Sequence, residues 1–489
     1  MKTLQEYIDC LKPFIVECSD TKTSRKISGV TNDSRKARPD SLFVAIKGAA
    51  SDGHNFIDDA IGRGAAAVIH SQNIAAPRSG VSYIKVNDSY AAYAFACECL
   101  FDFPSRSFDL AGITGTNGKT TTAYILKSML ERSTFKCGLI STVEYSTGSD
   151  IIEGSRTTPE AWELQALFAR MKNNSCRNVV MEVSSHGLDQ SRTASARFKA
   201  AVFTNLTGDH LDYHRDMETY FNAKKRLFAE FMHIDGKAII NIDDPYSRRL
   251  LELLPAEKIM TLGTTPASDC RIYPRTASAS GTDCGILFRG KMIYFKSNLI
   301  GMHNMYNLVS AFLAAIAMGV PEKKAEEALS AEYHVPGRLE KYKSPAGAFF
   351  FVDYAHTDDA LRNVLNALKK LASQRIITVF GCGGDRDKTK RPRMGLAASK
   401  LSDHLIVTSD NPRTEDPLAI IRDISKGIPS GTSFEMIPDR AQAIKKAVET
   451  AKKDDIVLLA GKGHENYQEI NGQHFDFSDS AELLKAFGN

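Results

Sequence analysis

The chain has 489 residues, 43% hydrophobic and 25% charged, a composition typical of folded globular proteins that excludes disordered, collagen-like and disulfide-scaffold proteins. At a soft prior of about 150 residues per domain, the length predicts roughly three domains. Lys and Arg total 62 and Asp and Glu total 58, so the net charge of +4 gives no indication of a nucleic-acid or membrane-surface partner.

The first 20 residues, the cysteines and the apolar runs predict a cytoplasmic protein. Residues 1–20 carry acidic side chains and lack a continuous apolar segment, so we expect no secretory signal. The 9 cysteines form no CxxC pair, which is typical of reduced thiols rather than of disulfides or a zinc site. The longest apolar run, residues 312–320, is about half of the roughly 20 residues that a membrane span needs. We therefore expect a buried helix there and no membrane span.

The first part of the chain predicts a small α/β domain. Short β-rich runs at residues 41–46 and 65–69 are separated by Gly- and Asp-rich turns. Pro104 interrupts a polar, helix-breaking stretch before a new apolar run begins at residue 108. We place this domain at residues 1–106.

The middle of the chain predicts a largely parallel sheet. Apolar runs at residues 108–114, 179–183, 200–204 and 238–242 are separated mostly by helical patterns. Strands that are buried on both faces and joined by helices indicate such a sheet. Residues 266–299 are rich in Ser, Thr and Gly, and we expect a hairpin insertion or a sheet edge there. We place this domain at residues 107–337.

A second set of strand candidates predicts a third α/β domain at residues 338–489. The candidates are residues 348–352, 375–380, 404–407 and 456–460. The predicted fold class is therefore α/β with three domains: a small N-terminal domain, a central P-loop-type ATPase domain with a parallel sheet, and a C-terminal Rossmann-like domain.

A phosphate-binding loop follows the first strand of the central domain. The loop consists of Gly115, Thr116, Asn117, Gly118, Lys119, Thr120 and Thr121, and helix-forming residues follow it. Glycines let backbone N–H groups approach phosphate, the lysine reaches the outer phosphates, and the Thr120 hydroxyl suits Mg²⁺. Ile113 stands where the full P-loop pattern has glycine, so this is a shortened variant. The alternative is an ordinary turn between a strand and a helix.

This loop and several later segments resemble the Mur ligase family, which builds the peptide of bacterial peptidoglycan. The similar segments, in chain order, are residues 112–122, 157–159, 182–190, 209–214, 220–228, 301–307, 335–338 and 353–356. Together they cover most of the chain beyond residue 108 and are far more specific than any single motif.

The resemblance implies the ATP and metal sites. ATP is expected at residues 115–121 together with Asn304, Asn307 and Arg338. Mg²⁺ is expected at Thr120, Glu182, His210 and Lys224, the last after carbamylation by CO₂, which makes the amine a carboxylate-like ligand. Lys119, Lys224 and His210 are the expected catalytic residues. From its position in an amphipathic helix alone, Lys224 would be a solvated lysine.

The resemblance also implies a site for the nucleotide-sugar substrate. Residues 32–35 resemble the family's uridine-side motif, with Ser34 as the expected contact. The muramoyl-dipeptide is expected at Thr157, Thr158, Ser184, Gln190 and Arg192.

Loops of the third domain are expected to select the amino acid. An arginine can form a bidentate pair with a carboxylate, and a glutamate can bind an ammonium group. The resemblance places these contacts at Arg391, Asp410, Asn411, Arg413, Gly461 and Glu465, an arrangement similar to that of members that add meso-diaminopimelate.

Three further features of this domain bear on its expected site. The Gly-rich run at residues 381–392 invites a dinucleotide-site interpretation, but its glycine spacing differs, and we expect no helix to open at the charged run ending at Pro392. Asp358 and Thr389 depart from the family pattern, which bears on loop geometry near the amino-acid pocket.

The expected activity is therefore an ATP-dependent ligase. It would add meso-diaminopimelate to the D-glutamate of UDP-N-acetylmuramoyl-L-alanyl-D-glutamate through an acyl phosphate formed on that glutamate. We expect a cytoplasmic monomer with small-molecule partners and no nucleic acid. The alternatives are the same ligase using L-lysine or L-ornithine, a folylpolyglutamate synthase-like ligase, a P-loop NTPase switch, and a non-catalytic cell-wall sensor.

Overall fold

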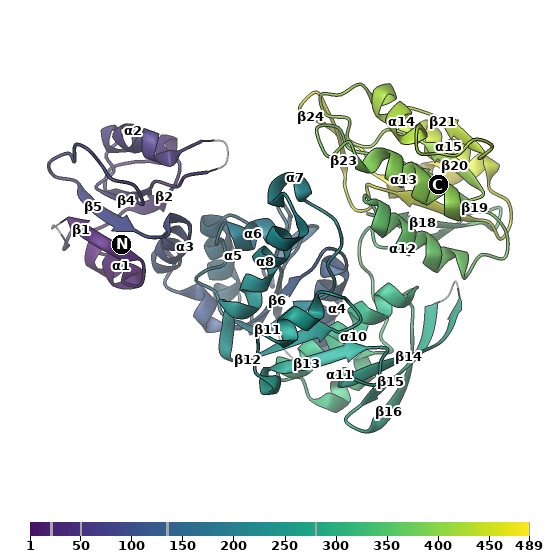
Figure 1. The fold of residues 1–489 in the computed structure, drawn as a ribbon, viewed down its shortest axis with the longest axis horizontal. Coiled ribbons are helices and arrows are strands. Elements are labelled where there is room, and N and C mark those ends of the chain that lie inside the picture. Colours follow the sequence, from purple (N-terminus) through teal and green to yellow (C-terminus); the bar gives the residue numbers. More distant parts are fainter. Residues whose placement is uncertain (20–22, 49–50, 134–135, 279–280, 489) are drawn as a thin grey trace.

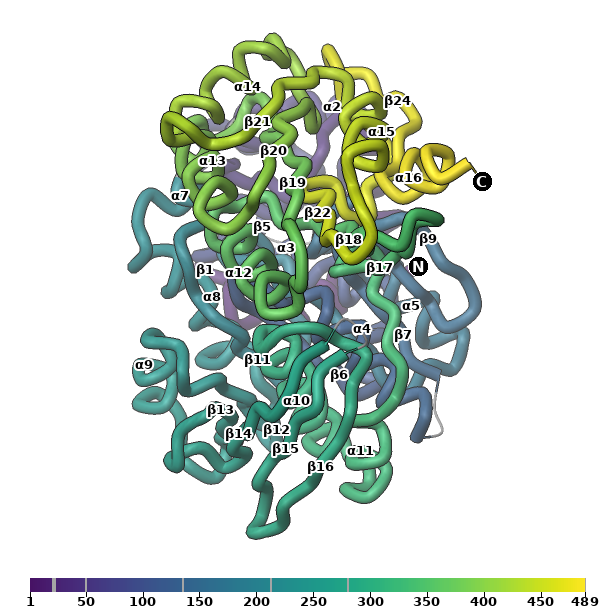
Figure 2. Tube along the Cα trace, turned by 90° about the vertical axis from the view of Figure 1, so that its right-hand side faces the viewer, coloured from purple at the N-terminus to yellow at the C-terminus, as the bar shows by residue number. Residues whose placement is uncertain are grey.

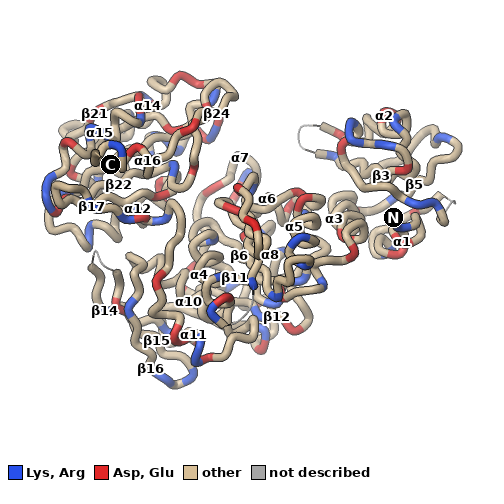
Figure 3. Tube along the Cα trace, turned by 180° about the vertical axis from the view of Figure 1, so that it is seen from behind, with Lys and Arg blue, Asp and Glu red and all other residues tan. Residues whose placement is uncertain are grey.

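The computed structural model describes residues 1–19, 23–48, 51–133, 136–278 and 281–488, which form three α/β domains built on separate sheets (Figure 1). The predicted fold class is confirmed. The domain limits at residues 106/107 and 337/338 stay predictions. Lys, Arg, Asp and Glu are intermixed on all three domains (Figure 3).

The N-terminal domain has a five-stranded sheet of order β1-β5-β4-β3-β2, in which only β1 is antiparallel. Both predicted strands are present, as β3 and β4. The elements are α1 (Leu4–Leu11), β1 (Ile15–Ser19), β2 (Gly29–Thr31), η1 (Ser34–Lys36), β3 (Ser41–Val44), η2 (Gly53–Phe56), α2 (Ile57–Gly62), β4 (Ala67–His70), β5 (Ser82–Val86), α3 (Ser89–Leu100) and η3 (Pro104–Ser107).

The central domain has an eleven-stranded sheet of order β16-β15-β14-β13-β12-β11-β6-β10-β7-β8-β9. The elements are β6 (Asp109–Thr114), α4 (Lys119–Arg132), β7 (Cys137–Ile140), β8 (Glu144–Ser146), β9 (Ile151–Glu153), α5 (Ala161–Asn173), β10 (Asn178–Glu182), α6 (Ser185–Asp189), β11 (Phe198–Phe203), α7 (Leu211–His214), α8 (Met217–Ala229), β12 (Met232–Asn241), α9 (Ser247–Leu251), η4 (Ala256–Lys258), β13 (Ile259–Gly263), β14 (Cys270–Ser278), β15 (Gly281–Phe288), β16 (Lys291–Ser297), α10 (Met302–Ala317) and α11 (Glu322–Ala328).

The middle of this sheet is parallel and buried on both faces. Alternate residues of β6 enter different cores: Leu110 packs with α5 and α8, whereas Ala111 packs with α4 and α10. The predicted insertion forms the antiparallel strands β14, β15 and β16 at one edge of the sheet. The longest apolar run lies in and just after α10, and no helix in the described part of the chain is long and apolar enough to cross a membrane.

The third domain has a six-stranded sheet of order β17-β18-β22-β19-β20-β21 and a separate hairpin, β23-β24. Its elements are β17 (Glu340–Lys343), β18 (Phe349–Asp353), α12 (Asp358–Lys369), β19 (Ile376–Phe380), α13 (Lys390–Leu401), β20 (His404–Val407), α14 (Pro417–Ser425), β21 (Phe434–Met436), α15 (Arg440–Thr450), β22 (Ile456–Ala460), β23 (Tyr467–Ile470), β24 (Gln473–Asp476) and α16 (Asp479–Phe487). Helix α12 lies on the side of this domain next to the central domain (Figure 2).

One expectation about the third domain is wrong. The charged run ending at Pro392 does open a helix, because α13 begins at Lys390. Proline is tolerated in the first turn, where a backbone N–H has no partner within the helix.

Candidate functional site

The phosphate loop connects β6 to α4, and two glycines give it its shape. Gly115 and Gly118 have φ values of +148° and +87°, which side-chain-bearing residues rarely adopt. A Cβ atom at Gly115 would lie 1.9 Å from the Thr204 hydroxyl, and one at Gly118 would lie 2.3 Å from the Asn307 side-chain oxygen. Only glycine therefore fits at either position, and Gly118 forms the N-cap of α4.

Two lysines meet at this loop. The Lys119 amine donates to the carbonyl oxygens of Gly115 at 3.0 Å and Thr116 at 2.8 Å. Lys224, from α8, donates to the same Gly115 oxygen at 2.9 Å. Lys224 is only 2% exposed. The helix pattern alone indicates a solvated lysine, and the structure shows a buried one instead. Burial, together with the nearby Lys119, lowers the pKa of the Lys224 amine well below its usual value.

The candidate metal ligands lie around the loop. Glu182, at the end of β10, is fully buried and accepts hydrogen bonds from the backbone and hydroxyl of Thr142 at 3.0 and 3.3 Å. His210 has a left-handed backbone, with φ 54°, and its Nε2 lies 3.4 Å from the Asp209 carboxylate. Thr120, Glu182 and His210 all line one cavity. Asp209 lines it as well; it lies in the family-like segment 209–214, but no site role was predicted for it.

These residues fit Mg²⁺. Within the described ranges, no three His, Cys, Asp or Glu side chains form a ready-made metal cluster. Mg²⁺ usually takes one or two carboxylates and completes its shell with water and substrate phosphates. A buried carboxylate and a hydroxyl beside a phosphate loop are that kind of donor set.

The cavity beside the loop has a volume of about 870 Å³ and extends from the central domain to the third. All three predicted ATP residues outside the loop line it: Asn304, Asn307 and Arg338. The Arg338 guanidinium donates to the Thr120 hydroxyl at 3.2 Å and lies over the Tyr354 ring. A cation that follows the last element of the central domain thus reaches the phosphate loop.

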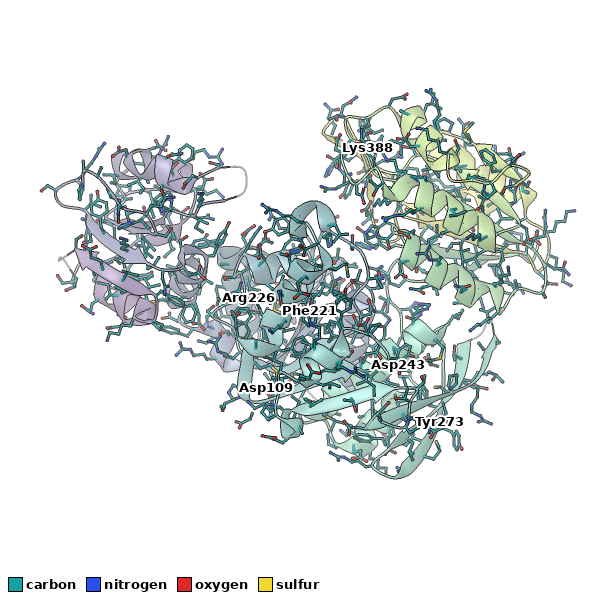
Figure 4. All side chains as sticks on the ribbon, viewed as in Figure 1. Asp109, Phe221, Arg226, Asp243, Tyr273 and Lys388 are labelled. Carbon is teal, nitrogen blue, oxygen red and sulfur yellow. The ribbon has the colours of Figure 1, made fainter. Side chains whose placement is uncertain are left out.

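The same cavity is lined by further residues that were not among the predicted ATP contacts. Asp243 accepts a hydrogen bond of 2.6 Å from the Tyr306 hydroxyl, and both residues line the cavity with His303. Figure 4 shows Asp243 in the central domain on the side facing the third domain. Arg275, on β14, also lines the cavity. His303 and Tyr306 lie on α10, inside the family-like segment 301–307, whereas Asp243 and Arg275 come from other parts of the chain that no motif covers.

Four of the five predicted dipeptide residues, Thr158, Ser184, Gln190 and Arg192, form one network. The Arg192 guanidinium donates to the Thr158 carbonyl at 2.8 Å and to the Gln190 side chain at 2.7 and 3.1 Å. The Thr158 hydroxyl donates to the Glu182 carbonyl at 3.0 Å and accepts from the Ser184 backbone N–H at 2.9 Å. The network therefore touches the backbone of the candidate metal ligand.

Two further residues predicted for the nucleotide-sugar site take different positions. The Thr157 hydroxyl lies 2.9 Å from that of Thr142 and lines the cavity beside the phosphate loop. Ser34 lies apart from the others, buried at the start of η1 in the N-terminal domain.

A second cavity, of about 570 Å³, contains most of the predicted amino-acid residues. Its lining includes Asp410, Asn411, Arg413, Gly461 and Glu465. Arg386, Lys390 and His356 also line it; the first two lie in the run 381–392 and His356 in the segment 353–356, but none was a predicted contact.

Arg391 is not among the lining residues of either cavity. It is 1% exposed, and its guanidinium pairs with Glu415 at 2.8 Å and with Asp423 at 3.1 Å. The charged loop therefore folds one of its arginines inward, onto its own domain.

Charged and amide groups in this second cavity hold one another in place. The Glu465 carboxylate accepts from the Asn411 amide at 2.8 Å and from the buried Lys462 amine at 3.0 Å. Burial and the nearby Asp410 raise the pKa of Glu465, and Lys462 opposes this shift. Arg413 pairs with Glu469 at 2.8 Å and donates to the Gly384 carbonyl at 2.8 Å. An anion and a cation thus border one cavity, as a zwitterionic ligand requires.

The two cavities share a wall. The residues common to both linings are Thr207, Asp209, His210, Tyr354, His356 and Asp359. A ligand bound in the cavity beside the phosphate loop would therefore lie next to a ligand bound in the cavity of the third domain.

Comparisons with known proteins match most of the chain. The Mur ligase family, catalytic domain, matches residues 26–93, the Mur ligase middle domain matches residues 113–315, and the Mur ligase, glutamate ligase domain, matches residues 337–463.

Relatives and solved structures agree with these matches. A UDP-N-acetylmuramoyl-L-alanyl-D-glutamate--2,6-diaminopimelate ligase from Geobacter sulfurreducens is 42% identical over 485 residues, which is 95% of each chain. One from Gloeobacter violaceus is 43% identical over 467 residues, which is 94% of each chain. A solved structure of a protein with the same name is 33% identical, has a TM-score of 0.70, and covers 100% of this chain and 99% of its own.

Proposed function

The chain belongs to the Mur ligase family, and from that premise we propose that it is the ATP-dependent ligase that joins meso-diaminopimelate to the D-glutamate of UDP-N-acetylmuramoyl-L-alanyl-D-glutamate. The product would serve peptidoglycan precursor synthesis in the cytoplasm, and the enzyme would act as a monomer. The observation that carries the proposal is the shared wall between a cavity at a phosphate loop and a cavity bordered by opposite charges.

The chemistry follows from the need to activate a carboxylate. A carboxylate oxygen of the D-glutamate attacks the γ-phosphorus of ATP, the bond to ADP breaks, and an acyl phosphate forms. The amine of the amino acid then attacks the acyl carbon, inorganic phosphate leaves, and the amine releases a proton. Lys119 and Arg338 would bind the phosphates, because both cations lie at the loop in the same cavity.

Thr120, Glu182, His210 and the carbamate of Lys224 would hold Mg²⁺. When bound, Mg²⁺ neutralises charge on the phosphates. Lys224 suits the modification because only a neutral amine adds to CO₂, forming an N–C bond and releasing a proton. The lowered pKa of this amine favours that neutral form at neutral pH.

The second cavity supports a diamino acid with a carboxylate at its far end. Glu465 and Asn411 would bind its ammonium group, and Arg413 would bind the carboxylate, with Asp410 and Gly461 shaping the pocket. Arg391 would act at a distance, since its guanidinium is paired with Glu415 and Asp423. L-Lysine and L-ornithine lack the carboxylate that Arg413 would recognise.

Phosphate release tests the proposal directly. The assay combines ATP, Mg²⁺ and UDP-N-acetylmuramoyl-L-alanyl-D-glutamate with meso-diaminopimelate, L-lysine or L-ornithine in turn. We expect release that requires both co-substrates and is fastest with meso-diaminopimelate. Release without the nucleotide-sugar peptide and the amino acid would identify a nucleotide switch. In a further arm, release only with a folate and glutamate would identify a folylpolyglutamate synthase. No release in any arm would identify a sensor.

A further inference from the structure

Asp359 is a carboxylate of the third domain that binds two loops of the central domain. It lies in the first turn of α12, and its Oδ2 accepts from the Asn117 side-chain amide at 3.1 Å and from the Thr207 hydroxyl at 3.2 Å. Asn363, one turn further along α12, donates to the same oxygen at 3.3 Å. Asn117 belongs to the phosphate loop, so Asp359 Oδ2 links that loop to the third domain, in addition to the contact of Arg338 with Thr120.

Both central-domain partners of Asp359 are firmly held on their own side. The backbone N–H of Asn117 donates to the Asn205 side chain at 2.9 Å, and its carbonyl accepts from Thr204 at 2.7 Å. The backbone N–H of Thr207 donates to the Thr116 hydroxyl at 3.0 Å. Asp359 therefore contacts a firmly held part of the nucleotide site, and Thr207 lies in the loop between β11 and the candidate ligand His210.

The residue before Asp359 in the same helical turn lines the amino-acid cavity. Asp358 pairs with Arg362 at 2.7 Å and lies 3.7 Å from Arg393 of α13. All three of these residues line the second cavity, whereas Asp359 lines both cavities. A shift of this turn would change the nucleotide loop and the amino-acid pocket together.

We propose that Asp359 is a positioning residue that links the nucleotide loop to the amino-acid cavity. Binding of either ATP or the amino acid thereby positions the first turn of α12 for the other substrate. The inference rests on the proposed function, because it assigns ATP to the first cavity and the amino acid to the second. Loss of the carboxylate weakens both ligands through one element. The dipeptide network of Thr158, Gln190 and Arg192 has no contact with Asp359 among the hydrogen bonds of the described residues.

Steady-state kinetics with three substrates test this role in the full-length enzyme. In Asp359→Ala, the KM values for ATP and for meso-diaminopimelate each rise about tenfold or more, the effect expected from losing a hydrogen bond to a charged group. The KM for the nucleotide-sugar peptide stays within about twofold, because its binding network is separate. Asp359→Asn keeps an acceptor oxygen without the charge and restores part of the loss.

The control is Glu449→Ala, which removes an exposed acid from α15 outside both cavities and leaves all three KM values unchanged. Thermal melting of every variant separates misfolding from mispositioning, and Asp359→Asn and Thr207→Val carry the test if Asp359→Ala fails to fold.

The results that would overturn the inference are unchanged KM values, an equal rise for all three substrates, or a rise for only one of the two linked substrates. Failure of the wild-type enzyme to release phosphate would instead overturn the proposed function, so the two failures are distinguishable.

Discussion

The side-chain amines of Lys119 and Lys224 donate to the same backbone oxygen, that of Gly115, at 3.0 and 2.9 Å. Two ammonium groups at one carbonyl in a buried site repel each other, and the more buried amine loses its proton more readily. The pKa of Lys119 is also lowered by burial, although Glu182 and Asp209 oppose that shift. The phosphate loop thus holds one lysine suited to binding phosphate and one suited to modification.

The first prediction concerns Lys224. Replacing it with Ala is expected to lower kcat by about a hundredfold or more, the size of effect seen when one charge-stabilising group is removed from an active site. Lys225→Ala, which changes the next residue of α8, serves as the control and is expected to keep most activity. Depleting CO₂ is expected to slow the wild-type enzyme, and bicarbonate to restore it. A Lys224→Ala enzyme with full activity would contradict the carbamate.

The second prediction concerns Gly118. An alanine there combines a positive φ with a Cβ 2.3 Å from the Asn307 side-chain oxygen. We expect the KM for ATP to rise at least about tenfold, because the helix N-terminus shifts relative to the phosphates. Gly290→Ala is the matched control: its φ is +76°, but nothing lies within 4 Å of the added Cβ. Equal KM values in the two variants would show that the clash does not matter for nucleotide binding.

The third prediction concerns Arg413. If its guanidinium binds the distal carboxylate of the amino acid, Arg413→Ala raises the KM for meso-diaminopimelate at least about tenfold and changes that for L-lysine little. Selectivity between the two amino acids, measured as a ratio of kcat/KM, reports the effect. Arg422→Ala, an exposed arginine on α14, is the control. A parallel loss for both amino acids would assign Arg413 a structural role.

The fourth prediction concerns the pH dependence of stability. Hydrogen bonds from the Arg391 guanidinium lower the pKa of Glu415 from 4.5 to about 2. A lowered carboxylate pKa stabilises the fold above the unfolded value, and this stabilisation is lost as the pH falls toward the folded value. Between about pH 5 and about pH 3, the free energy of unfolding of the wild type should fall more than that of Glu415→Gln. Urea denaturation at both pH values measures the free energy of unfolding. An identical decrease in the two proteins would mean that the Arg391–Glu415 pair contributes nothing.

Much of the fold was readable from local sequence patterns. The buried strands of the central and third domains, the antiparallel edge and the phosphate loop all appear where the apolar runs and glycines place them, since these signals are set by neighbours along the chain. The start of α13 was misjudged because Pro392 was treated as a helix breaker, although a proline in the first turn costs no hydrogen bond.

The sequence by itself determined the three-domain α/β fold, the loop from Gly115 to Thr121 and, by resemblance, the ligase family. The tertiary structure decided the burial of Lys224, the inward pairing of Arg391 and the place of Asp359 between two cavities. Each of these depends on contacts between residues far apart in the chain: Lys224 meets Gly115, and Asp359 meets Asn117. Charge and exposure at such positions are set by partners from other elements, and periodicity along one segment carries no information about those partners.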